Sequence, residues 1–201
     1  MAPAEAGLSL FVASFSAHVM AVDRVEQRLK RVAAALDAAG IPYAVVGGNA
    51  VASWVGRVDP SATRATKDVD LLVKRADIDR ITSALTGAGL RREDLRDLVL
   101  FVDPAEPSRR AGIHLVWAGE RVRPSYTVPA PTVEESVRDP EGFRVLDLAA
   151  LVRMKLTSFR DIDRVHIADL LSVGLIDAKI EGALPAELKR RLDEVAKSRD
   201  E

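Results

Sequence analysis

Two aspartates separated by one residue, Asp68 and Asp70, are the side chains of this sequence with the clearest potential for chemistry. The apolar residues around and after them predict a β-strand. Because side chains alternate along a strand, both carboxylates should lie on one face, about 7 Å apart, while Val69 and Leu71 enter the core. Hard divalent cations such as Mg²⁺ or Mn²⁺ prefer oxygen ligands of this kind. The pair therefore predicts a metal site.

A glycine pair, Gly47 and Gly48, follows the apolar residues 43–46, which predict a short strand. A helix is expected to begin at Asn49. Glycine lets the backbone approach a phosphate closely, and the start of a helix offers free N–H groups at the positive end of the helix dipole. A phosphate-binding turn followed by a metal-binding pair is typical of phosphoryl or nucleotidyl transfer.

The runs Val46-Gly47-Gly48-Asn49-Ala50 and Thr66-Lys67-Asp68-Val69-Asp70-Leu71 resemble the Gly-Gly turn and Asp-x-Asp pattern of the nucleotidyltransferase superfamily with the polymerase-β-like fold. They look most like the small bacterial AbiEii-type toxin nucleotidyltransferases. The resemblance implies transfer of an NMP from an NTP to an acceptor hydroxyl of RNA (including tRNA), a small molecule or a protein. It implies that the glycine pair and Asn49 bind the nucleotide, and that a cognate antitoxin is a candidate partner.

Members of this superfamily normally carry a third carboxylate on a later strand, and here the matching position holds His114. Imidazole binds Mg²⁺ less well than a carboxylate does, but its pKa near neutrality suits a general base. His114 could equally be a structural residue, and Asp103 is the other candidate for the missing carboxylate. The alternative function is a non-catalytic domain that binds a nucleotide or a partner and retains the fold.

Three cations are candidates for pairing with the triphosphate. The run Met154-Lys155-Leu156, followed by Arg164, resembles the signature after the catalytic core of the toxin-type enzymes, which implies that Lys155 reaches the triphosphate. Arg164 is a weaker match. Lys67 lies in the loop of residues 56–67 with Arg57 and Arg64; such charges either face the phosphates or are solvated surface groups.

The periodicity of the chain predicts strands and helices in the middle of the chain and a helical extension at its C-terminus. The resemblance implies that they form an α/β (α+β) fold with a mixed sheet flanked by helices. Expected helices cover residues 23–40, 76–89, 147–159, 161–173 and 184–201, and expected strands cover 43–46, about 68–73, 99–103, 112–118 and, at an edge, 143–146. Residues 124–142 read as an irregular connector. The expected organisation is an apolar arm or helix (1–22), a nucleotidyltransferase-like core (23–146) and a helical part packed on it (147–201).

Composition limits the remaining possibilities. The 201 residues contain no cysteine, which excludes disulfides and thiol chemistry. A net charge of −1 gives no global attraction to nucleic acid, so RNA would need a local surface, such as the arginines of residues 91–123. Residues 6–22 lack Asp, Glu, Lys and Arg, but no basic segment precedes them and serines interrupt them. We therefore expect neither a signal peptide nor a membrane span, and a cytoplasmic protein.

Overall fold

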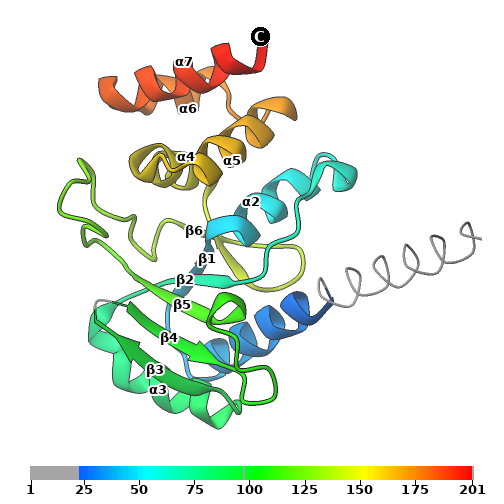
Figure 1. Ribbon diagram of the computed structural model, residues 1–201, viewed down its shortest axis with the longest axis vertical. Coiled ribbons are helices and arrows are strands. Elements are labelled where there is room, and N and C mark those ends of the chain that lie inside the picture. The colour runs from blue at the N-terminus through cyan, green and yellow to red at the C-terminus, as the bar shows by residue number, and fades with distance from the viewer. Residues whose placement is uncertain (1–22, 97, 201) are drawn as a thin grey trace, which may run out of the picture.

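The computed structural model describes residues 23–96 and 98–200 (Figure 1). The arm or helix predicted for residues 1–22 lies outside these residues. Within them, the expected mixed α/β fold with C-terminal helices is confirmed. No helix in this part of the chain is both long and apolar enough to cross a membrane.

The strands and helices follow the predicted order with a few additions. The strands are β1 (Tyr43–Val46), β2 (Val69–Val73), β3 (Arg91–Leu95), β4 (Leu98–Val102), β5 (Ile113–Trp117), β6 (Ser136–Arg138) and β7 (Arg144–Leu146). After a helix at residues 23–38 come α2 (Gly47–Gly56), α3 (Ile78–Gly87), α4 (Leu148–Ser158), α5 (Asp161–Ser172), α6 (Ala178–Ala183) and α7 (Ala186–Asp200).

The seven strands form one mixed sheet in the order β3-β4-β5-β2-β1-β7-β6. β2 runs antiparallel to β1 and parallel to β5, so the strand that carries Asp70 lies at the centre. All four residues of β1 are buried, as are four of the five in β2. This burial makes the central strands a rigid base for the polar side chains at one end of them.

Two expectations at the sheet edges are wrong. Residues 143–146 were expected to form an edge strand, but β7 lies between β1 and β6. The edge strand is β6, three residues within the segment expected to be an irregular connector. The opposite edge is β3, a charged segment without the alternation of apolar residues that predicts a strand; it forms by pairing with β4 along its whole length.

The helices occupy two sides of the central strands (Figure 1). The helix of residues 23–38 and α3 lie toward β3 and β4, and Arg80 of α3 donates hydrogen bonds to the carbonyl groups of Ala39 and Gly40. α2, α4 and α5 lie on the other side, and α7 lies at the end of the molecule farthest from α3. Asp147 caps α4 by accepting a hydrogen bond from the Ala150 amide.

Candidate active site

Asp68, Asp70 and His114 meet at one end of the central strands. β2 and β5 are paired with Asp70 opposite His114, and Asp68 directly precedes β2. One ligand atom from each of the three residues can be chosen so that all lie within 4.8 Å of one another. The three side chains are partly exposed, and together they offer two carboxylates and one imidazole. This donor set fits a divalent cation.

Hydrogen bonds fix the position of Asp68. Its carboxylate Oδ1 accepts from the Thr66 hydroxyl at 2.8 Å, and its main-chain carbonyl accepts from Asn49 Nδ2 at 2.6 Å. Asn49 was expected to bind the nucleotide, but its side-chain amide donates to the Asp68 carbonyl group and holds Asp68 in place. Thr66 was not identified from the sequence as a site residue, although it stands two positions before Asp68.

The glycine turn packs directly against the acidic pair. α2 begins at Gly47 and not at Asn49 as expected. Gly47 has a φ of +68°, and a Cβ atom there would lie 2.0 Å from Asp70 Oδ2. At Gly48 a Cβ would lie 3.1 Å from the side chain of Thr66. The backbone at the start of α2 thus approaches the carboxylates because neither residue has a side chain.

His114 faces both carboxylates through one nitrogen. Its Nδ1 lies 3.6 Å from Asp68 Oδ2 and 3.5 Å from Asp70 Oδ1. Hydrogen bonding to Asp70 raises the pKa of His114 above its ordinary value, against the opposing effect of burial. Without a cation, the positive charge of the protonated ring therefore partly offsets the repulsion between the two aspartates.

A cavity of about 860 Å³ opens beside this cluster. Its walls come from α2, β5, α5 and the loops of residues 62–66 and 120–124, and Gly48, Asp68, Asp70 and His114 lie along it. A second cavity of about 170 Å³ lies between the start of α2 and the segment of residues 122–130. Asp70, Lys155 and Arg160 line both cavities, so these residues stand where the two spaces adjoin.

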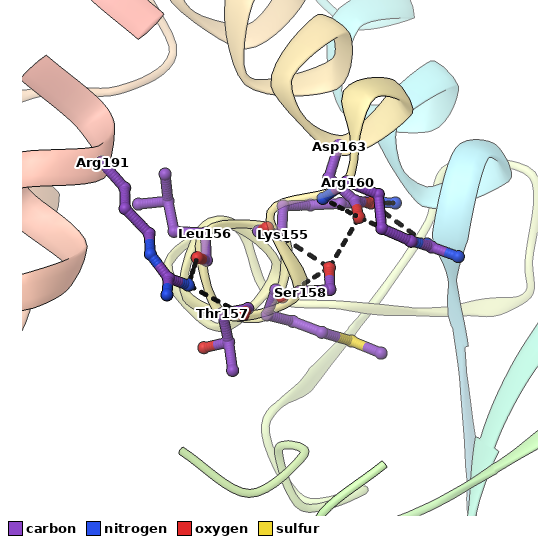
Figure 2. Close-up of polar contacts among 8 residues, drawn as sticks. Lys155, Leu156, Thr157, Ser158, Arg160, Asp163 and Arg191 are labelled. Atoms are coloured by element: carbon purple, nitrogen blue, oxygen red, sulfur yellow. Dashed lines mark hydrogen bonds and ion pairs between the residues drawn. The ribbon is translucent and has the colours of Figure 1, made fainter. Parts of the chain in front are cut away.

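Lys155 lies at the cavity wall but is already paired. Its side-chain nitrogen is 3.0 Å from Asp163 Oδ1, with the two residues only 4% and 0% exposed. Figure 2 shows that Lys155, Ser158 and Arg160 converge on Asp163 between α4 and α5. On another side of α4, Arg191 of α7 donates to the carbonyl groups of Leu156 and Thr157.

The charges around Asp163 keep it ionised. Burial alone would raise the pKa of this carboxyl, but hydrogen bonds from Arg160 and Ser158 and the charge of Lys155 hold it well below its usual range. The buried Lys155–Asp163 pair and the exposed Arg160 side chain form one network of charges. Lys155 makes one hydrogen bond to Asp163, and its ammonium group has further N–H donors that could pair with a phosphate.

Three other candidates lie elsewhere. Arg164 pairs with Glu194 of α7 and stacks on the Phe159 ring, with its guanidinium carbon 4.5 Å from the ring centre, so it turns away from the cavity. Lys67 is exposed and lines neither cavity. Asp103 pairs with Arg31 of the helix at residues 23–38 and is absent from the cluster, which leaves His114 in the third position.

Two cavity residues were not among the sequence-based candidates. Arg160 lines both cavities, as Asp70 does, and its hydrogen bond to Asp163 is the main cause that raises its pKa. His166 is only 8% exposed, and its Nδ1 has no hydrogen-bond partner among the described residues. Burial, followed by the charge of Lys155, lowers the pKa of His166 to about 4. Both residues follow the Lys155 segment closely in sequence, but only the turn between α4 and α5 brings them to the cavity.

The arginines expected to offer a track for RNA are engaged with carboxylates at several positions. Glu93 lies 2.9 Å from Arg91 and 2.8 Å from Arg109, and Asp94 lies 2.8 Å from Arg92. These ion pairs lie along β3 and on the turn that precedes β5. They lower the positive charge that this face could present to a phosphate backbone.

Comparison with known proteins gives a family and a fold. Residues 2–129 match the model of a family described as "Uncharacterised nucleotidyltransferase". The chain matches no curated protein sequence.

Two solved structures share the fold. An antigenic nucleotidyltransferase-like protein from Paracoccidioides brasiliensis aligns with a TM-score of 0.58 and 17% identity over 90% of each chain. ANT(2″)-Ia in complex with adenylyl-2″-tobramycin aligns with a TM-score of 0.52 and 18% identity, over 89% of this chain and 99% of the other. At such identities the likeness concerns the fold alone.

Proposed function

The chain belongs to this nucleotidyltransferase family, and from that premise we propose that it transfers an NMP from an NTP to an acceptor hydroxyl group with the help of a divalent cation. One observation carries the proposal: the ligand atoms of Asp68, Asp70 and His114 lie within 4.8 Å of one another beside a cavity of about 860 Å³. Pockets for small ligands typically measure about 300–1,000 Å³. The cavity therefore has room for a nucleotide next to the acidic pair.

In the proposed reaction, the acceptor oxygen attacks the α-phosphorus, the bond to the bridging oxygen breaks, and pyrophosphate leaves. The hydroxyl proton passes to a base at the site, for which His114 and the carboxylates are the candidates. A divalent cation on Asp68 and Asp70 would polarise the phosphate oxygens and offset the charge that develops on them. Mg²⁺ and Mn²⁺ both suit the carboxylates.

The remaining groups would position the nucleotide. Main-chain N–H groups of Gly47 and Gly48 at the start of α2 would bind phosphate oxygens. Arg160 and Lys155, both at the junction of the two cavities, would pair with the triphosphate. Asn49 would act through Asp68 and not through the nucleotide.

For the acceptor, we favour a small molecule. The cavity is of the size that small ligands occupy, and the arginines along β3 are paired with neighbouring carboxylates. RNA and protein acceptors are the alternatives that the assay below separates.

Three other expectations stay predictions from sequence. They are the closer likeness to AbiEii-type toxins with a cognate antitoxin, the cytoplasmic location, and the division of the chain into an arm, a core and a helical part.

The assay supplies each NTP labelled with ³²P at the α-position or at the γ-position, with Mg²⁺ or Mn²⁺ and with RNA, protein or small-molecule extracts as acceptors. Nucleotidyl transfer should label an acceptor from the α-position only, because the γ-phosphate leaves in pyrophosphate. Asp68→Asn and Asp70→Asn should abolish the labelling. Asp79→Asn, which removes an exposed carboxylate of α3, is the matched control and should retain it.

The same assay tests the non-catalytic alternative. If NTP binds with its metal but no acceptor is labelled in any extract, the chain is a nucleotide-binding domain that retains the fold. Labelling from the γ-position instead would indicate phosphoryl transfer and would contradict the proposed reaction.

A further inference from the structure

The orientation of the His114 ring is set by a main-chain carbonyl group. Nε2 lies 2.9 Å from the carbonyl oxygen of Arg109. A carbonyl oxygen only accepts hydrogen bonds, so Nε2 carries the hydrogen and donates it. Nδ1 faces Asp68 Oδ2 and Asp70 Oδ1, which are 3.6 and 3.5 Å away. It donates to the carboxylates while the ring is protonated, and once this proton is lost, Nδ1 is the nitrogen with the free lone pair.

The surrounding backbone restricts this ring. His114 has a strand on each side, with Asp70 of β2 and Leu100 of β4 opposite it. The 3-10 turn Arg109–Ala111 brings the Arg109 carbonyl back to the ring. Gly112 allows this tight turn, because a Cβ there would lie 3.1 Å from the Phe101 carbonyl oxygen and 3.2 Å from that of Arg109.

This arrangement has the form that proteins use for metal-binding histidines. Such a histidine typically donates its other ring N–H to a carbonyl or carboxylate group, which fixes the tautomer and the direction of the lone pair. Two atoms that bind one cation at about 2.1 Å can lie at most about 4.2 Å apart. The distances from Nδ1 to both carboxylates are within this limit.

We infer that Nδ1 of His114 is the third protein ligand of the cation, and that this nitrogen makes the site select a first-row transition-metal ion such as Mn²⁺ over Mg²⁺. The inference rests on the proposed function, because it concerns the cation of that site. Mg²⁺ demands oxygen ligands, whereas Mn²⁺ and the later divalent ions accept imidazole with increasing affinity. When Nδ1 binds the cation and Nε2 donates to Arg109, His114 has no free nitrogen to accept a proton, so of the candidate bases named above the carboxylates remain.

The direct test is pulsed electron paramagnetic resonance of the wild-type protein loaded with Mn²⁺ and NTP. An imidazole ligand should give a ¹⁴N coupling to the bound ion. His114→Gln is the informative variant, because its amide nitrogen can still donate to the Arg109 carbonyl but it has no atom equivalent to Nδ1. The coupling should vanish in this variant and persist in His166→Gln, which removes the other imidazole at the cavity.

Affinity gives a second, independent readout. Mn²⁺ and Mg²⁺ binding should be measured by titration for the wild type, His114→Gln and His114→Asp. Loss of even an outer partner of a metal ligand costs roughly 10–100-fold in affinity, so His114→Gln should weaken Mn²⁺ by at least about tenfold while changing Mg²⁺ little. His114→Asp should tighten Mg²⁺ binding and reduce the preference for Mn²⁺.

The outcomes separate this inference from the proposed function. Bound Mn²⁺ without a ¹⁴N coupling, together with unchanged affinities in His114→Gln, would overturn the ligand role of His114 and leave the carboxylate site intact. If neither the wild type nor His114→Asp bound a divalent cation in the presence of NTP, the metal site of the proposed function would fail as well.

Discussion

A Cβ atom at Gly47 would lie 2.0 Å from Oδ2 of Asp70 and 2.8 Å from its carboxyl carbon. The turn after β1 and the carboxylate of β2 are therefore fitted to each other at van der Waals contact. The positive φ of Gly47, +68°, is also a conformation that L-residues with side chains rarely adopt. Two separate constraints thus require glycine at this position.

We expect Gly47→Ala to displace the Asp70 carboxylate and to weaken divalent-cation binding by about tenfold or more, since misplaced metal ligands commonly cost this much. Strain at the positive φ should also lower the free energy of unfolding by about 1–3 kcal/mol. Isothermal titration with Mn²⁺ and urea denaturation would measure the two effects separately.

The control for this substitution is Gly87→Ala at the end of α3. Gly87 is exposed, its Cβ would meet nothing within 4 Å, and its φ is not positive. Alanine there should leave cation binding unchanged and stabilise the helix slightly, by about 0.5–1 kcal/mol. Normal Mn²⁺ affinity in Gly47→Ala would show that the Asp70 carboxylate can move without loss of cation binding, and would contradict the need for glycine at this position.

The sequence predicted the acidic pair but not all of the strands around it. Strand periodicity placed Asp68 and Asp70 together, because alternation along a strand depends on local geometry alone. The resemblance to the superfamily placed His114 on a later strand at the position of the third carboxylate, and in the structure this strand pairs with β2 so that Asp70 lies opposite His114. The short strands β3 and β6 were missed, since pairing with neighbours and not their own residue pattern makes them strands.

Charged side chains were the least predictable part of the site. A long cation on a helix can reach several partners, and tertiary packing decides which one it meets. Arg164 meets Glu194 of α7, and Lys155 meets Asp163 of the following helix. The sequence shows these charges but not the distances between helices, so Arg160 reaches the cavity where Arg164 was expected.

Lys155 offers a test of that buried network. Lys155→Met keeps the length of the side chain but leaves Asp163 with Arg160 and Ser158 as its remaining partners. Removing one member of a buried pair typically costs 3–5 kcal/mol. Because two partners remain, we expect a loss of about 1–3 kcal/mol in the free energy of unfolding. Affinity for NTP should fall roughly tenfold or more, and affinity for the matching nucleoside should change little.

The double variant Lys155→Met/Asp163→Asn separates stability from binding. With no buried carboxylate left uncompensated, the double variant should recover much of the lost stability. It should still bind NTP weakly, because the cation remains absent. Equal losses for NTP and nucleoside, in either variant, would remove Lys155 from the phosphate site.

His166 predicts a pH dependence of stability. Its pKa is about 4 in the folded protein, against an ordinary value of about 6.5. Between these values the unfolded chain binds a proton at His166 and the folded chain does not, so stability falls as the pH decreases from about 6.5 to about 4. The shift corresponds to a loss of up to about 3 kcal/mol.

Urea denaturation of the wild type and His166→Gln across this pH range would isolate the contribution, since the titration of other carboxyl groups is common to both proteins. The difference in free energy of unfolding between pH 7 and pH 4.5 should be smaller in the variant. Parallel curves for the two proteins would mean that the pKa of His166 is the same in the folded and unfolded states.

Asn49 should act on the metal through Asp68, because its Nδ2 donates to the Asp68 carbonyl at 2.6 Å. Asn49→Ala should weaken Mn²⁺ binding by roughly tenfold and leave metal-free nucleoside binding unchanged. Thr66→Val, which keeps the side-chain shape but loses the hydrogen bond to Asp68 Oδ1, should have an effect in the same direction. Titrations with Mn²⁺ and with nucleoside alone would measure both. If Asn49→Ala weakened nucleoside binding without metal while Mn²⁺ affinity held, Asn49 would contact the nucleotide directly.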